Sequence, residues 1–327
     1  MEGYRLEIIR CEGLTKVYRR FEKEEGLRGS MRSLFHREMI EKRAVDGVDL
    51  AVSAGEFVGL IGPNGAGKTT LTKLMTGIIR KTAGELSVLG FDPNRLQNEF
   101  KMQYAVVMGQ KSQLFFELTA ADSLLLMKEM YKIPSDAYRK NVRSFSELFG
   151  VEELLNVQVR TLSLGERMKM ELIAALLHNP RVLFLDEPTI GLDAVAQKQM
   201  RAFLREVNRT RGTTIVLTSH YMDDIRALCE RCVVINRGRK IYDGGMEALF
   251  DRYQTHRKLT VTFSEAGEHP VPAGCALVER TNSRLTLLAE RARAREIVRD
   301  LFSETDVVDV EIGEEDIGSV VERIYSA

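Results

Sequence analysis

Short apolar runs alternate with amphipathic segments over roughly the first 250 residues of the chain. The mostly apolar stretch 56–61 and the apolar run 182–185 are typical of buried strands. Looser alternation of apolar and polar positions at 6–18 and 44–53 predicts two further strands. Strands separated by longer helical patterns are typical of an α/β domain.

Helical spacing fills the stretches between these runs. Leu71, Leu74 and Ile78 recur at intervals of three and four residues, which predicts a helix with one buried face soon after the strand at 56–61. From about 114 to 178 the apolar residues keep helical spacing, and strands resume only afterwards. We therefore expect a helical insertion of about 114–178 within the α/β domain.

Two regions depart from this alternation. Residues 19–43 begin as a polar segment, and 26–37 then place apolar residues on one helical face with arginines around it. Such an amphipathic insertion can lie on a membrane or against a partner, or it can be a solvated surface helix of its own domain. After residue 250, alternating strands and an amphipathic helix predict a small, ferredoxin-like α+β domain over 251–327, without a catalytic constellation.

The composition is that of an ordinary soluble globular protein, with 44% hydrophobic and 29% charged residues among 327. Basic and acidic residues both number 47, so no basic field favours nucleic acid as a partner. No apolar run reaches the length of a membrane span, and the first residues lack the apolar core of a signal peptide. Four cysteines are few, and Cys229 and Cys232 indicate a helix-to-strand join rather than a zinc site. We expect a protein of the reducing cytoplasm.

The strand at 56–61 leads into a glycine-rich loop with a phosphate-binding pattern. Residues 62–69 read Gly-Pro-Asn-Gly-Ala-Gly-Lys-Thr and fit G-x-x-x-x-G-K-[ST]. Glycines let backbone N–H groups turn toward phosphates, Lys68 can reach the β- and γ-phosphates, and Thr69 can ligate Mg²⁺. A plain glycine turn before a helix is the alternative, but the strand-loop-helix context favours a nucleotide site. Its predicted residues are Gly62, Pro63, Asn64, Gly65, Ala66, Gly67, Lys68, Thr69 and Thr70.

Titratable side chains follow two other apolar runs. Asp186 and Glu187 come directly after 182–185, and two carboxylates at a strand end are unfavourable unless a cation such as Mg²⁺ meets them. His220 follows a later apolar run in the same way, although a hydrogen-bonded surface histidine is the alternative. Tyr18, at the end of the first predicted strand, is either a stacking platform for a base or one more strand aromatic.

In this order the motifs resemble those of the ATPase subunit of ABC transporters, across about residues 6–250. The matching positions are Tyr18 for the adenine-stacking aromatic, 62–69 for the Walker A loop, Gln110 for the Q-loop, 162–166 for the signature, 182–187 for the Walker B strand, 191–193 for the D-loop and His220 for the switch histidine. The resemblance implies a P-loop NTPase core of the RecA-like type, with ATP and Mg²⁺ as cofactors and ATP hydrolysis as the activity.

The resemblance also implies roles for single residues. Thr69, Gln110 and Asp186 would surround Mg²⁺. Glu187 would be the general base that orients the attacking water. His220 would contact the γ-phosphate and sense its loss.

A second set of residues implies a second ATPase subunit. Ser163 and Gly165 would act on ATP held by the other subunit, and Asp193 of the D-loop is assigned to the same site. Because one chain carries a single motif set, two copies face to face, most simply a homodimer, would enclose two ATP molecules. The signature departs from the usual Leu-Ser-Gly-Gly-Gln at Leu164 and Glu166. The extra negative charge of Glu166 near a polyanion predicts a less tight closure than with glutamine.

Residues 109–114 and 219–224 look like the branch of the family whose partners are ABC-2-type permeases, mostly exporters. The chain is then expected on the cytoplasmic face of the membrane, held there by integral-membrane permease subunits. The insertion at 19–43 is also similar to polysaccharide-exporting relatives. A soluble ATPase acting on nucleic acid or ribosomes and a scaffold with a decayed site are the alternatives. A single motif set, the lack of a basic tract and an intact set of catalytic residues weigh against both.

Overall fold

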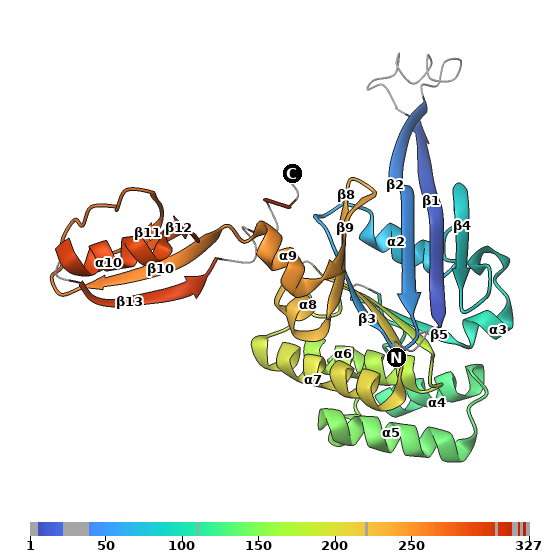
Figure 1. Cartoon of the computed structure of the whole chain (residues 1–327). Coiled ribbons are helices and arrows are strands. Elements are labelled where there is room, and N and C mark those ends of the chain that lie inside the picture. The colour runs from blue at the N-terminus through green and yellow to red at the C-terminus, as the bar shows by residue number, and fades with distance from the viewer. Residues whose placement is uncertain are drawn as a thin grey trace, which may run out of the picture. The chain divides into compact units, whose positions relative to one another are not determined.

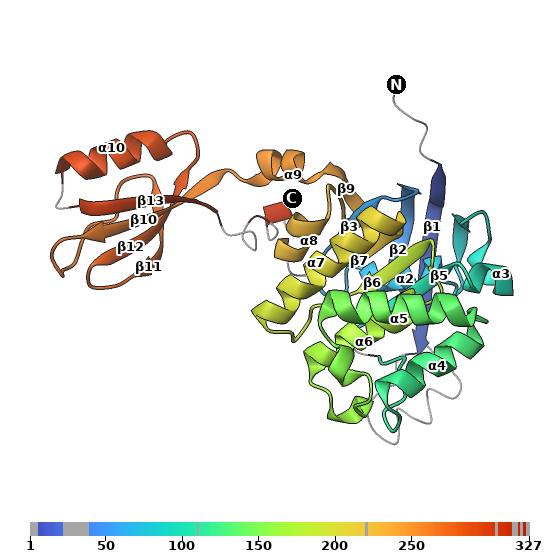
Figure 2. The ribbon, with the colours of Figure 1, turned by 90° about the horizontal axis from the view of Figure 1, so that it is seen from below.

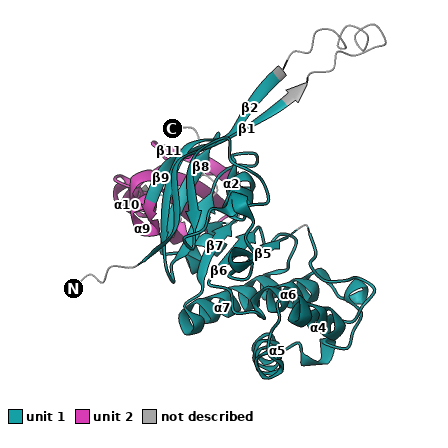
Figure 3. Cartoon of the chain, turned by 90° about the vertical axis from the view of Figure 1, so that its right-hand side faces the viewer, with its two compact units in different colours: residues 1–243 teal, residues 244–327 magenta. Residues whose placement is uncertain are grey.

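The computed structural model describes residues 6–21, 39–109, 111–219, 222–304, 307–315, 320 and 323–324. The chain divides into two compact units, residues 1–243 and 244–327 (Figure 3). The division falls before the boundary expected at 250, so helix α9 (Met246–Tyr253) belongs to the second unit.

Unit 1 is organised around a six-stranded sheet that carries the glycine-rich loop (Figure 1). In sheet order its strands are β5 (Tyr104–Met108), β6 (Val182–Asp186), β7 (Thr214–Thr218), β3 (Phe57–Ile61), β8 (Arg231–Asn236) and β9 (Arg239–Gly245). The neighbours from β5 to β8 pair in parallel, and every residue of β3 and β7 is buried. Burial on both faces explains why such strands read as nearly continuous apolar runs. The carboxyl ends of the parallel strands meet along one edge, which is where ligands bind in sheets of this kind.

A second, antiparallel sheet shares its core with the first. In it β1 (Glu7–Phe21) lies between β2 (Met39–Ser53) and β4 (Ala83–Val88). Helix α2 (Lys68–Met75) buries Leu71 and Leu74 in a cluster that also contains Ile9 of β1 and Phe184 of β6. Helix α2, which follows the glycine-rich loop, is therefore packed between the two sheets.

The first two strands are longer than predicted. Residues 19–21 and 39–43, which the sequence assigned to the amphipathic insertion, form a two-stranded ribbon instead. Arg19 lies opposite Glu41, and their side chains form an exposed ion pair at 3.0 Å. Cross-strand pairs of charged residues stabilise a ribbon without apolar alternation, so the pattern contained no strand signal here. The predicted helix at 26–37 lies outside the described residues.

The segment between β5 and β6 is helical, and its helices lie together at one side of unit 1 (Figure 2). They are α4 (Ala120–Met130), α5 (Ser135–Phe149), the short turns η2 (Glu152–Leu154) and η3 (Val159–Thr161), and α6 (Leu164–Leu176). Phe145 and Phe149 of α5 pack on Phe203 of α7 (Ala194–Arg211), with ring centroids 5.7 and 3.7 Å apart. This aromatic contact joins the helical block to the sheet-bearing part of unit 1. The short helices η1 (Pro93–Arg95), α3 (Asn98–Lys101) and α8 (Met222–Leu228) complete the described helices of unit 1.

Unit 2 has a core of its own. Strands β11 (Cys275–Arg280), β12 (Arg284–Glu290), β10 (His256–Phe263) and β13 (Val307–Glu314) form an antiparallel sheet in that order. Helix α10 (Ala294–Glu304) covers one face, where Ile297 and Leu301 join Val261 and Leu287 in a buried cluster (Figure 1). The alternation of β10 thus turns its apolar side chains toward α10, giving a small α+β domain.

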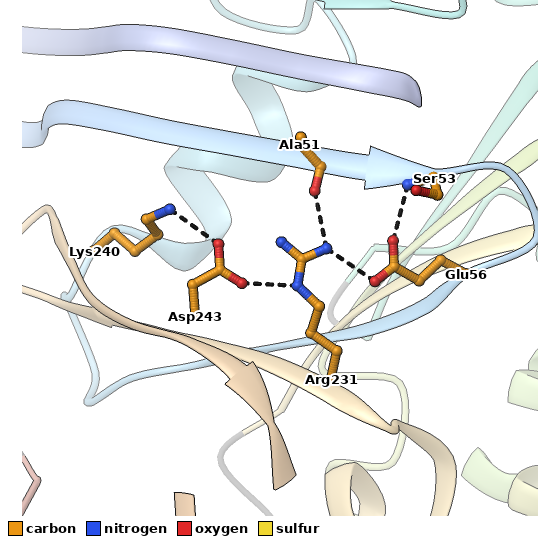
Figure 4. Close-up of polar contacts among 6 residues, drawn as sticks. All are labelled: Ala51, Ser53, Glu56, Arg231, Lys240 and Asp243. Atoms are coloured by element: carbon orange, nitrogen blue, oxygen red, sulfur yellow. Dashed lines mark hydrogen bonds and ion pairs between the residues drawn. The ribbon is translucent and has the colours of Figure 1, made fainter. Parts of the chain in front are cut away.

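An ion-pair network ties β8 and β9 to the strands beside them (Figure 4). Arg231 donates to Asp243 at 2.7 Å, to Glu56 at 2.9 Å and to the carbonyl oxygen of Ala51 at 3.0 Å. Lys240 donates to the second oxygen of Asp243 at 2.9 Å. Burial by itself would raise the pKa of Asp243, but the hydrogen bonds from Arg231 and Lys240 outweigh it and lower that pKa.

Replacing Asp243 with asparagine is expected to reduce the free energy of unfolding by about 2–3 kcal/mol at pH 7, because Arg231 would lose a charged partner in a largely buried network. Since the pKa of Asp243 is lowered in the folded state, this contribution is present above the ordinary aspartate pKa and is lost as the pH falls below it. Urea unfolding at pH 7 and near pH 3 should therefore show a deficit that shrinks in acid. Asp136→Asn, in an exposed pair at the first turn of α5, is the control and should reduce the free energy of unfolding by less than about 1 kcal/mol. Equal stability of Asp243→Asn and the parent at pH 7 would contradict this account.

Candidate active site

The loop between β3 and α2 requires glycine at two positions where no side chain fits. A Cβ atom on Gly62 would lie 2.3 Å from the carbonyl oxygen of Ile235, and one on Gly67 would lie 2.3 Å from the carbonyl oxygen of Ala44. Gly67 also has a φ of +112°, in the left-handed region that favours glycine. The chain therefore turns directly from strand into helix, and the first N–H groups of α2 remain for an anion.

A cavity of about 430 Å³ opens beside this loop. It is lined by Tyr18, Arg19, Lys42, Ala44, Asn64, Gly65, Ala66, Gly67, Lys68, Thr69, Thr70 and Glu187. Tyr18 and Glu187, distant in the sequence, thus meet at the glycine-rich loop. Arg19 and Lys42 add two cations that the sequence did not single out. Arg19 and Lys42 reach the cavity through the pairing of β1 with β2, in which Tyr18 lies opposite Lys42. The sequence could not show this pairing, because the two strands were expected to end at 18 and begin at 44.

Lys68 is buried at the base of the loop, with only 5% of its surface exposed. Its Nζ donates to the carbonyl oxygens of Gly62 at 2.6 Å and Pro63 at 3.2 Å. Burial lowers the pKa of Lys68, against the opposing effect of the nearby Glu187 and Asp186 carboxylates. Two neutral oxygens hold the cation in place, so its charge is left for a phosphate.

Thr69 and Asp186 form a corner rich in oxygen atoms. The Thr69 hydroxyl lies 2.9 and 3.1 Å from the two carboxylate oxygens of Asp186, and the Thr218 hydroxyl also donates to Asp186. Mg²⁺ prefers oxygen ligands of this kind and fills the rest of its shell with phosphates and water. Within the described ranges, no group of three or more histidine, cysteine, aspartate or glutamate side chains could hold a metal alone. The residues present therefore fit a magnesium ion that arrives with a phosphate substrate.

Two predicted site residues, Gln110 and His220, lie outside the described residues. Gly109, which precedes Gln110, donates its N–H to the carbonyl oxygen of Asp186 at 3.0 Å. Ser219, which precedes His220, is fully buried after the end of β7. The residues before both positions therefore lie at the sheet edge that carries Asp186. The roles of Gln110 and His220 stay predictions.

Glu187 follows β6 in a backbone conformation that few residues adopt. Its φ is +53°, and its N–H donates to the carbonyl oxygen of Thr218 at 2.9 Å. A Cβ atom on Gly109 would lie 2.5 Å from the carbonyl oxygen of Glu187, so the segment of the chain beside Glu187 also requires a glycine. A strained backbone of this kind persists only where surrounding contacts hold it in place, and such strain is concentrated at functional sites. It places Glu187 on the cavity wall with Lys68 and Thr69.

The buried Asp224 holds the segment that follows Glu187. Asp224 of α8 is 1% exposed and accepts hydrogen bonds from the Thr189 hydroxyl and, at 2.7 Å, from Arg201 of α7. These contacts tie the segment after Glu187 to two helices. Asp224 lies in the stretch 219–224 noted in the sequence, but it was given no role of its own, because an acid in the first turn of a helix is ordinary.

Ser163 caps the start of α6 in a reciprocal arrangement with Glu166. The Glu166 N–H donates to the Ser163 hydroxyl oxygen at 3.3 Å, while one Glu166 carboxylate oxygen accepts from the Ser163 hydroxyl at 2.7 Å and from the Ser163 N–H at 2.8 Å. These hydrogen bonds lower the pKa of Glu166. The departure from glutamine at this position therefore adds a charged partner to the helix cap.

The predicted residues Ser163, Gly165 and Asp193 do not line the cavity. Asp193 caps α7 by accepting from the N–H of Ala196 at 2.8 Å. A Cβ atom on Gly191 would lie 2.9 Å from a methyl group of Leu164, so Leu164 packs against the loop before α7. Within one chain, Ser163 and Asp193 therefore cap the first turns of α6 and α7, and neither they nor Gly165 reach the glycine-rich loop of their own chain.

A glycine-rich loop between a parallel strand and a helix, a buried lysine in that loop and an acidic pair at a nearby strand end define a P-loop NTPase. The sequence model of the family described as ABC transporter matches residues 45–190. The chain is 32% identical over 209 residues to the ABC transporter ATP-binding protein NatA of Bacillus subtilis (strain 168), a match that covers 64% of this chain and 85% of that protein. The chain belongs to the ATP-binding proteins of ABC transporters.

Other relatives agree with this family, and solved structures share its fold. The linearmycin resistance ATP-binding protein LnrL of Bacillus subtilis (strain 168) is 30% identical, over 70% of this chain and 73% of that protein. The Nod factor export ATP-binding protein I of Neorhizobium galegae is 37% identical, over 64% of this chain and 60% of that protein. A solved ATP binding subunit of an ABC transporter shares the fold, with a TM-score of 0.62 and 23% identity over 75% of this chain and 93% of that chain. So does the cassette MJ0796 in a dimeric post-hydrolysis state bound to ADP and Pi, with a TM-score of 0.60 and 23% identity over 73% of this chain and 98% of that chain.

The protein is therefore an ATP-binding subunit of an ABC transporter, and it hydrolyses ATP. Throughout the part of the chain that the structure describes, none of the helices combines the length and the apolar character needed to cross a membrane.

Proposed function

We propose that this subunit drives a separate integral-membrane permease of the ABC-2 type in the direction of export. The convergence of Lys68, Thr69 and Glu187 on one cavity, with Asp186 bonded to Thr69 at its edge, is the observation that supports the ATP-hydrolysing site from which such a permease would be driven. Export is supported by relatives that are named for Nod factor export and linearmycin resistance. The chain would then work in the cytoplasm, at the cytoplasmic face of the membrane, through its contact with the permease.

In this proposal the triphosphate of ATP lies along the loop from Gly62 to Thr70, and Tyr18 stacks on the adenine. The loop N–H groups and Lys68 donate to the phosphate oxygens. Held by Thr69, Asp186 and Gln110, a magnesium ion would supply positive charge that stabilises the charge developing on the transferred phosphoryl group.

Glu187 then acts on the attacking water. Its carboxylate accepts a hydrogen bond from the water and takes up a proton as the water oxygen bonds to the γ-phosphorus and the bond to ADP breaks. His220 contacts the γ-phosphate and loses that contact after hydrolysis. Closure and reopening are thus driven by completion and loss of the contacts around one phosphate.

A second copy of the chain completes each site. Ser163 and Gly165 stand at the N-terminal end of α6, a position that suits an anion, yet they are absent from the cavity of their own chain. In a homodimer they would face the ATP held by the other copy, with Asp193 in the adjoining loop. Two ATP molecules would then lie between the two subunits.

The experiment that tests this proposal is purification of the tagged full chain from detergent-solubilised membranes of its own host. We expect a multi-spanning membrane protein to co-purify in a fixed ratio and to raise ATP hydrolysis after reconstitution, with ATP-dependent uptake of cargo into inside-out vesicles. Recovery of the chain alone, with unaltered basal hydrolysis, would contradict the permease partnership and leave the ATPase assignment standing.

Replacing Glu166 with glutamine is expected to lower the ATP concentration needed for dimerisation by about three- to tenfold, because one negative charge near the second copy's triphosphate is removed. Glutamine can still accept from the Ser163 N–H, so the helix cap should remain. Size-exclusion chromatography of the full chain over a series of ATP concentrations measures the effect. Glu129→Gln, at an exposed position of α4, is the control. Equal ATP requirements for Glu166→Gln and the parent would show that the charge does not oppose closure.

A further inference from the structure

The carboxylate of Glu171 lies at a junction inside unit 1 that the reaction scheme does not use. Glu171 stands on α6, about two turns beyond Ser163, and is 3% exposed. It accepts hydrogen bonds from the Ser112 hydroxyl and from the N–H of Gln113, the latter at 3.0 and 3.1 Å to its two oxygens. Burial raises the pKa of Glu171, while the bonds from Ser112 and Gln113 and the charge of Arg167 oppose that shift.

The residues that Glu171 holds, Ser112 and Gln113, lie two and three positions after the proposed magnesium ligand Gln110. Before Gln110, Gly109 is bonded through its N–H to Asp186 at 3.0 Å. After it, the N–H of Lys111 donates to the carbonyl oxygen of Met108 at 2.9 Å, and the next two residues are bonded to Glu171. The loop is therefore anchored on one side to the sheet edge and on the other to α6. Fixing a loop on both sides is how supporting residues position a ligand between them.

The same helix carries Ser163 at its start. From Met168 to Leu176 all but one residue of α6 is buried, so this part of the helix is closely packed and would shift as one element. A shift of the loop at Ser112 would pass through Glu171 to α6 and so to the end that bears Ser163. The loop serves the chain's own ATP, and the start of the helix serves the ATP of the second copy.

A carboxylate is the side chain that this junction needs. Burying an ionised carboxylate is unfavourable unless hydrogen bonds compensate it. Glu171 meets that condition by offering two acceptor oxygens to donors that both belong to the loop. A glutamine of the same size would offer one acceptor oxygen and would turn donor atoms toward the loop.

We propose that Glu171 is a positioning residue that couples the two ATP sites of the dimer. It fixes the loop that carries Gln110 and transmits the loop's position through α6 to Ser163. This inference rests on the proposed function, because it assumes that Gln110 meets the metal and that Ser163 acts on the second copy's ATP. Glu171 itself touches neither nucleotide nor metal.

The test uses the purified full chain with Mg²⁺ and ATP. Glu171→Gln is expected to raise the Mg²⁺ concentration for half-maximal hydrolysis several-fold and to lower the Hill coefficient for ATP toward one. Binding of a fluorescent ATP analogue in EDTA should stay at the parent value, because the glycine-rich loop is untouched, whereas the loss of buried hydrogen bonds at position 171 should lower the melting temperature. Ser112→Ala should give the same changes in weaker form, and the double variant should be no worse than Glu171→Gln alone, since both act through one contact.

The controls separate this role from a purely structural one and from the proposed function. Glu147→Gln, in an exposed ion pair on α5, should match the parent throughout. An unchanged Mg²⁺ requirement and Hill coefficient in Glu171→Gln would overturn the proposal. So would effects of Glu171→Gln and Ser112→Ala that add in the double variant. A loss of ATP-analogue binding in EDTA that accompanies the loss of thermal stability would also overturn it. If Gln110→Ala leaves the Mg²⁺ requirement unchanged, the metal role of Gln110 fails, whereas a lowered Hill coefficient in Glu171→Gln still supports the coupling.

Discussion

Replacing Glu187 with glutamine is expected to leave ATP binding intact and to lower hydrolysis by about a hundredfold or more. Glutamine has nearly the same shape, but it cannot take up the proton of the attacking water. Hydrolysis would then no longer remove the phosphate that holds two copies together. The variant should run as a stable dimer with ATP and Mg²⁺ in size-exclusion chromatography, whereas the parent should return to monomer as ATP is consumed.

The comparison for Glu187→Gln is Glu129→Gln, which removes an exposed charge that does not line the cavity and should hydrolyse ATP as the parent does. Binding of ATP is measured in parallel by isothermal titration calorimetry. A Glu187→Gln protein that hydrolyses ATP at the parent rate would refute the role assigned to this carboxylate.

Replacing Lys68 with alanine is expected to weaken ATP binding by about a hundredfold and to abolish measurable hydrolysis. Lys68 supplies a largely buried cation at the base of the cavity, and hydrogen bonds to charged groups contribute about 1.5–3 kcal/mol each. The Gly62 and Pro63 carbonyl oxygens would also lose their donor, so some loss of stability should accompany the loss of binding.

Lys73 lies on the same helix with its side chain partly exposed and provides the matched control. Lys73→Ala should bind and hydrolyse ATP as the parent does. Calorimetric titration with ATP measures affinity, and thermal melting shows whether Lys68→Ala remains folded. A folded Lys68→Ala protein with parent affinity for ATP would place the nucleotide elsewhere.

The buried strands of unit 1 and the glycine-rich loop could be predicted from the sequence, because both leave a local signal. Strand β3 is buried at every position and so reads as an apolar run, and the loop after it has a fixed residue pattern. Asp186 and Glu187 could be found in the same way, since carboxylates directly after such a run need a reason to be there. The convergence of these motifs on one cavity follows from the parallel sheet.

Features that depend on partners distant in the sequence could not be predicted. The ribbon at 19–21 and 39–43 is formed by antiparallel backbone pairing with one exposed ion pair, Arg19–Glu41, across it, and neither strand shows a clear apolar alternation. Glu171 and Asp224 look like ordinary polar positions of helices, and only the fold shows that their partners are Ser112 and Thr189. Arg19 and Lys42 likewise join the site only through the register of β1 and β2.

Mixing two inactive variants tests most directly whether each ATP is held between two copies of the chain. Lys68→Ala removes the binding loop's cation but keeps α6. Ser163→Asp leaves the binding loop intact, but it removes the hydroxyl that donates to Glu166 and adds a negative charge at the start of α6, where the other copy's phosphate is proposed to lie. Each variant alone should be nearly inactive. Because their mixed dimer contains one complete site, hydrolysis by the mixture should rise well above the sum of the separate samples. A mixture that stays inactive, or a Ser163→Asp protein that is fully active by itself, would contradict the shared site.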